Sequence, residues 1–99
     1  DLLHSAPRQM ILQRRLALPT PTYAHLPVAT DASGVKLSKS AGAAAIDLSQ
    51  PSQELWRALR FLRQQPPVDL READTATLWE WAKEHWRLAP LQGRATDPA

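Results

Sequence analysis

Two lysines and two serines stand within five consecutive positions of this 99-residue chain, in the stretch KLSKS. They are Lys36, Ser38, Lys39 and Ser40, and they follow a turn segment, DASG, whose Gly34 can adopt a positive φ. A pair of ammonium groups on a loop behind a glycine turn suits the binding and release of a polyphosphate. A nucleophilic serine would need a neighbouring base, so we expect the two serines to shape the loop rather than to react.

A second group of cations recurs every third residue, at Arg57, Arg60 and Arg63. On a helix, these side chains could follow an RNA backbone, because each contact with a phosphate releases counterions. An ordinary solvated helix face is the alternative. The group is therefore a candidate RNA-contacting surface.

Metal and redox chemistry are not indicated. The chain has no cysteine, and His4, His25 and His85 have no companion ligand at a metal-binding spacing, so no metal site is predicted. The four tryptophans are expected to lie in the core and at helix contacts rather than to stack on bases; they are Trp56, Trp79, Trp81 and Trp86.

Composition limits the chain to one small domain or part of one. Its hydrophobic content is 43% and its formal net charge is only +2, so any nucleic-acid contact must come from a local patch. Apolar runs stay far below the ~18 residues of a membrane span. We expect a soluble, cytoplasmic protein.

Start and stop signals predict three helices and one short strand. Helix is expected over 6–17, where Pro7 stands in the first turn, and again from Ser49 or Ser52 to the prolines at 66–67. A third helix is expected from Asp74 or Thr75 to about residue 86. The segment YAHLPVAT, 23–30, is expected to be a short strand, and its proline, which removes a backbone donor, indicates an edge strand or a strand end.

The order of these features resembles a known family. A helix start SAPRQMILQRRL, a proline linker, the strand YAHLP, the turn DASG and the loop VKLSKS follow one another over roughly residues 1–40. Together they resemble the second half of the catalytic domain of class I glutamyl-type aminoacyl-tRNA synthetases, whose signature loop has the form KMSKS, often with Leu for Met. The resemblance implies an α/β fragment, mostly α, with the C-terminal half of a Rossmann-like nucleotide-binding domain over 1–45, a helical region over 46–90 and a disordered tail over 91–99.

The segment WAKEHW and the short ending are similar to the glutamyl-Q tRNA(Asp) synthetases within that family. This resemblance implies an ATP-dependent ligase that activates glutamate and transfers it to the queuosine of tRNA(Asp), with Mg²⁺ accompanying the ATP. It implies that Lys39, assisted by Lys36, is catalytic, and that the ATP-binding residues are Lys36, Leu37, Ser38, Lys39 and Ser40.

The resemblance also implies what should lie elsewhere. The HIGH signature, the glutamate-binding residues and a zinc site of the family would precede Asp1, so the chain is expected to be inactive alone and to expose apolar surface where the missing N-terminal half of the domain docks. Two alternatives stay open. One is part of an ordinary glutamyl- or glutaminyl-tRNA synthetase, and the other is a non-enzymatic helical RNA-binding module that uses the arginines.

Overall fold

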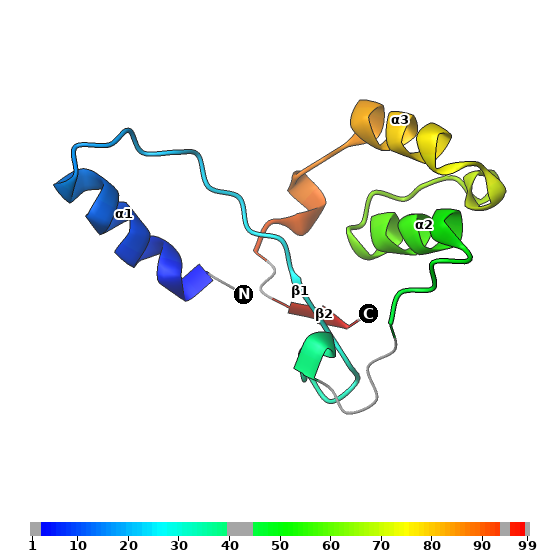
Figure 1. Ribbon diagram of the computed structural model, residues 1–99, viewed down its shortest axis with the longest axis horizontal. Coiled ribbons are helices and arrows are strands. Elements are labelled where there is room, and N and C mark those ends of the chain that lie inside the picture. The colour runs from blue at the N-terminus through cyan, green and yellow to red at the C-terminus, as the bar shows by residue number, and fades with distance from the viewer. Residues whose placement is uncertain (1–2, 40–44, 94–95, 99) are drawn as a thin grey trace.

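The chain is mostly helical with little strand (Figure 1), as expected. The computed structural model describes residues 3–39, 45–93 and 96–98. In order, the α-helices, 3₁₀ turns (η) and strands are η1 Leu3–Ser5, α1 Ala6–Arg15, β1 Val28–Thr30, η2 Leu37–Lys39, α2 Pro51–Phe61, η3 Val68–Glu72, α3 Thr75–His85, η4 Ala89–Leu91 and β2 Thr96–Pro98. Within these described ranges, no helix has the length and apolar content needed to cross a membrane.

Helix α1 confirms the first predicted helix and lies apart from the α2 and α3 pair (Figure 1). Pro7 stands in its first turn, whereas the Ser5 side chain makes no capping hydrogen bond. The apolar side chains of Ile11, Leu12 and Leu16 are 58–60% exposed. The chain has a radius of gyration of 16.5 Å, where a compact domain of this length has about 13 Å. The apolar surface expected to be exposed is therefore present on α1.

The core lies between α2 and α3. Trp56 and Leu59 of α2 pack against Leu78 and Ala82 of α3, and all four side chains are buried. The indole Nε1 of Trp56 donates a hydrogen bond of 2.9 Å to the carbonyl of Pro67, just before η3. The η3 turn carries the chain back along the pair, so that α2 and α3 run in roughly the same direction (Figure 1). Their C-terminal ends consequently meet at one end of the pair.

Helix α2 ends earlier than predicted, at Phe61 rather than at the prolines. Arg63 takes a left-handed backbone conformation with φ +55°, and the amide of Gln64 donates to the carbonyl of Leu59 at 3.0 Å. This pattern is a helix end closed by a left-handed residue, a role in which glycine is usual. Arg63 therefore lies beyond the helix instead of continuing its exposed face.

Only half of the tryptophan prediction is right. Trp56 is buried and Trp81 packs against the core, but Trp79 and Trp86 are 54% and 40% exposed. The helical period of α3 explains the exposure of these two indoles, because it directs Leu78 and Ala82 toward the core instead. The two exposed indoles line an apolar groove at the edge of the helix pair.

The predicted strand over 23–30 is shortened to β1, which begins directly after the buried Pro27. It pairs in parallel with β2, Val28 opposite Thr96 and Thr30 opposite Pro98. In the described part of the predicted tail over 91–99, Leu91 is buried and β2 pairs with β1, and the expected disorder stays a prediction. The division at 45 and 90, and a Rossmann-like origin of the first part, stay predictions.

Candidate functional site

The lysine loop, which we define as residues 31–39, is rooted in a tight turn at the carboxyl end of β1. The Asp31 carboxylate accepts hydrogen bonds from the amides of Ser33 and Val35, at 2.9 and 3.0 Å. Gly34 has φ +81°, the conformation that the DASG segment predicted. An antiparallel bridge between Thr30 and Lys36 closes the turn. The sequence thus builds a fixed base for the two lysines.

The lysines are arranged by η2. The amide of Lys39 donates to the carbonyl of Lys36 at 2.8 Å, which is the i to i+3 bond of a 3₁₀ turn. Lys36 stands directly before η2, and Lys39 is its last residue, so the two lysines lie at the two ends of one short turn. Lys36 is half-buried, and Leu37, Ser38 and Lys39 are exposed. Ser40, also predicted to bind ATP, lies outside the described residues.

The position of the loop fits the binding of an anionic ligand. It follows the carboxyl end of a strand in a parallel pair, which is where open α/β sheets bind ligands. The structure therefore places Lys36 and Lys39 within one short segment after β1, and their contact with ATP stays a prediction.

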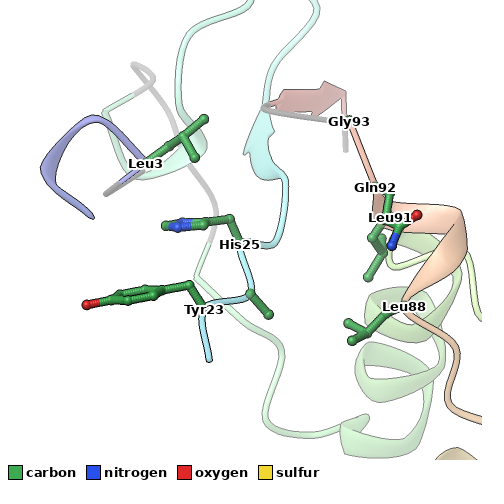
Figure 2. Close-up of a pocket in the computed structure, with 8 residues that line it drawn as sticks. Leu3, Tyr23, His25, Leu88, Leu91, Gln92 and Gly93 are labelled. Carbon is green, nitrogen blue, oxygen red and sulfur yellow. The ribbon is translucent and has the colours of Figure 1, made fainter. Parts of the chain in front are cut away.

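A hollow of about 420 Å³ lies between the segment before β1 and the segment after α3 (Figure 2). The rings of Tyr23 and His25 stack with their centroids 6.4 Å apart, and the Tyr23 hydroxyl donates to Oε1 of Gln13 at 3.0 Å. Leu88 and Leu91 point into the hollow from the opposite side (Figure 2). This largely apolar hollow is lined by residues from the N-terminal and the C-terminal parts of the chain. It was not predicted from the sequence.

The histidines have local packing roles. His25 takes part in the stack just described, and the His85 ring lies on Trp81 with centroids 4.7 Å apart. Nδ1 of His85 is 2.8 Å from the carbonyl oxygen of Trp81. Nowhere in the described ranges do three His, Cys, Asp or Glu side chains gather in a way that could hold a metal ion.

The three predicted arginines divide into two groups. Nη1 of Arg57 pairs with Oε1 of Glu54 at 2.7 Å on exposed surface. Arg60 lies over the ring of Trp56, 5.0 Å from its centroid, and with Arg63 it lines a groove of about 560 Å³. Arg87, which follows α3, lines the same groove. Sequence reasoning missed Arg87 because nothing local indicates that the ends of α2 and α3 meet.

Perturbed acids lie at helix starts. The amide of Thr77 donates to Asp74 at 2.7 Å, and this hydrogen bond is the main reason that the pKa of Asp74 is below its ordinary value. The pKa of Asp47 is lowered chiefly by the hydroxyl of Ser49, which donates at 2.6 Å. Each carboxylate accepts its hydrogen bonds from a residue two or three positions later in the chain. These contacts stabilise the local turn and give no indication of acid and base chemistry.

Known proteins resemble the chain over almost all of its length. It is 48% identical over 98 residues to the glutamyl-Q tRNA(Asp) synthetase of Methylococcus capsulatus, covering 98% of this chain and 32% of that protein. The corresponding proteins of Aromatoleum aromaticum and Dechloromonas aromatica are 46% and 51% identical, over 99% and 100% of this chain and 32% and 34% of theirs. No family model and no solved structure matches.

By their names, these relatives are all tRNA synthetases, and that is the class of protein that the chain matches. It spans about one third of the length of the curated relatives it matches. Within that class, the chain belongs to the glutamyl-Q tRNA(Asp) synthetase family.

Proposed function

We propose that this chain supplies the ATP-binding loop of an enzyme that activates glutamate with ATP and transfers it to the queuosine of tRNA(Asp). The observation that carries the proposal is an identity of 46–51% to three relatives of that name over 98–100% of the chain. The loop geometry supports it, because both lysines belong to one short turn that follows the carboxyl end of β1. Because the chain spans a third of these relatives, other residues of the enzyme are needed for the full reaction.

Lys39 has the central role in this proposal. In the activation step, a carboxylate oxygen of glutamate forms a bond to the α-phosphorus of ATP, and the bond from that phosphorus to the leaving pyrophosphate breaks. Negative charge builds on the phosphate oxygens during this exchange, and a cation placed there lowers the barrier. Lys39 stands at the exposed end of η2 and can reach such a ligand, with Lys36 beside it at the base.

The rest of the loop positions these charges. Leu37, Ser38 and Ser40 contact ATP in the proposed complex, and the turn that Asp31 organises sets where η2 begins. A loop of this kind must also move, because pyrophosphate has to leave before the next step.

The remaining structure is assigned in the same proposal. Residues 1–45 represent the second half of a nucleotide-binding domain, and 46–90 form a helical region that approaches the tRNA. Arg60 and Arg63 are the proposed tRNA contacts of the original three, because they line one groove whose lining does not include Arg57.

The test uses a hybrid enzyme in which this chain replaces the aligned third of the Methylococcus capsulatus relative. Glutamate-dependent exchange of labelled pyrophosphate into ATP measures activation alone. Lys39→Ala should lower the exchange rate by about 10²–10³, the effect typical of removing one group that stabilises transition-state charge. Lys83→Ala, at an exposed lysine on α3, is the matched control and should leave the rate unchanged. Equal rates for the two variants would contradict the role of Lys39.

A further inference from the structure

A buried, hydrogen-bonded glutamine lies where the C-terminal ends of α2 and α3 meet, outside the lysine loop. Gln64 is 2% exposed, and its side-chain amide donates to the carbonyls of Leu62 and Arg87 at 2.7 and 3.0 Å. Its Oε1 accepts from the amide of Arg87 at 2.8 Å. A buried glutamine thus fastens the segment after α2 to the segment after α3, two places 23 positions apart.

This fastening brings three guanidinium groups to one groove. Arg60 comes from the last turn of α2, Arg63 from the segment after it, and Arg87 from the segment after α3. Gln65 and Pro90 complete the lining of this arginine groove. All three arginines are exposed, so an external ligand can reach them.

The backbone around the groove is strained. Arg63 and Gln65 both have positive φ, +55° and +56°, on either side of Gln64. Such conformations cost non-glycine residues about 1–2 kcal/mol each and concentrate at ligand sites. The strain is offset here by the hydrogen bonds of Gln64, which hold the arginines at the groove instead of letting the chain relax.

The ends of α2 and α3 explain part of the positive charge at the arginine groove. The C-terminal ends of α2 and α3 carry partial negative charge, which favours a cation near each. Arg60 also lies over the ring of Trp56. Three arginines also line one groove of about 560 Å³, and guanidinium groups gathered in this way attract an anion that enters it.

We propose that the arginine groove binds the phosphate backbone of RNA through Arg60, Arg63 and Arg87. An open groove with three planar guanidinium groups suits successive phosphates of a strand, each of which can accept paired hydrogen bonds. The choice of RNA rests on the proposed function, in which the partner is a tRNA. The lining of the groove includes no residue of the lysine loop, so phosphate contact there is separate from ATP contact at that loop.

The test measures binding of a tRNA(Asp) transcript to the hybrid enzyme as a function of salt. Arg63→Gln and Arg87→Gln should each weaken binding roughly 5- to 10-fold at 0.1 M salt, and should each lower the slope of log K against log salt by about 0.7–0.9. Arg57→Gln is the matched control, because this exposed arginine on α2 is paired with Glu54 outside the groove. It should change binding less than twofold.

Tryptophan fluorescence and circular dichroism confirm that each variant is folded. Because a variant may lose affinity through its fold, Arg87→Lys provides a second comparison: it keeps the charge and should recover most of the salt slope. The proposal would be overturned if Arg63→Gln and Arg87→Gln both kept the affinity and salt slope of the wild type. It would also be overturned if Arg57→Gln lost as much affinity as they do. Pyrophosphate exchange by the hybrid enzyme is read separately, with Lys39→Ala against Lys83→Ala, so failure of the groove and failure of the proposed function are distinguishable.

Discussion

Replacing Gln64 by alanine should destabilise the chain strongly. The substitution removes three hydrogen bonds, of 2.7, 3.0 and 2.8 Å, from a side chain that is 2% exposed. Each such bond contributes about 1 kcal/mol net, and buried partners left without a bond cost more. The expected loss is therefore about 2–4 kcal/mol, a large part of the 5–15 kcal/mol typical of a whole domain.

Unfolding monitored by tryptophan fluorescence measures this loss, because Trp56 lies in the core beside the affected segment. At about 4–8 °C per kcal/mol for a chain of this size, the midpoint should fall by roughly 10–25 °C. Gln65→Ala is the matched control: the residue type and positive φ are the same, but the side chain is exposed. Its effect should stay within about 0.5 kcal/mol. A loss below 1 kcal/mol for Gln64→Ala would refute the fastening role.

Three further predictions concern the lysine loop, the start of α3 and the surface of α1. In the hybrid enzyme, Asp31→Ala should slow pyrophosphate exchange roughly five- to tenfold because two hydrogen bonds of the turn are lost, whereas Asp31→Asn, which keeps the acceptor oxygen, should exchange near the normal rate. The pKa of Asp74 is lowered in the folded chain, so its contribution is present above the unfolded value, near 3.8, and is lost as pH falls through the lower folded value. Urea midpoints below pH 4 should therefore fall less steeply in Asp74→Asn than in the parent chain, and identical pH profiles would contradict the cap. The 99-residue chain should self-associate in sedimentation through the exposed apolar face of α1, and Ile11→Glu with Leu12→Glu should shift it toward monomer; a monomeric parent chain would contradict this.

The parts of the fold that local signals determine could be predicted. Helix α1 begins at its early proline, α3 begins where Asp74 accepts from the amide of Thr77, and the turn before η2 follows from Gly34. In each case, the residues that determine the structure are neighbours in the chain. The lysine loop was visible in the sequence for the same reason.

The parts of the fold that depend on contacts between distant residues could not be predicted from the sequence. The parallel pairing of Val28 with Thr96 joins two segments that are far apart in the sequence, and no local pattern predicts it. The early end of α2 depends on Gln64, whose partner Arg87 lies 23 residues away. Arg87 therefore joins the arginine groove for a reason that only the arrangement of the helices supplies.

The most direct test of the account is glutamate charging by the hybrid enzyme. Labelled glutamate and ATP are offered with tRNA(Asp) that carries queuosine and, in parallel, with tRNA(Glu). The account predicts label on tRNA(Asp) alone, and its loss in Lys39→Ala but not in Lys83→Ala. Label on tRNA(Glu) would instead indicate an ordinary glutamyl-tRNA synthetase, and label on neither tRNA by a folded hybrid would contradict the proposed activity.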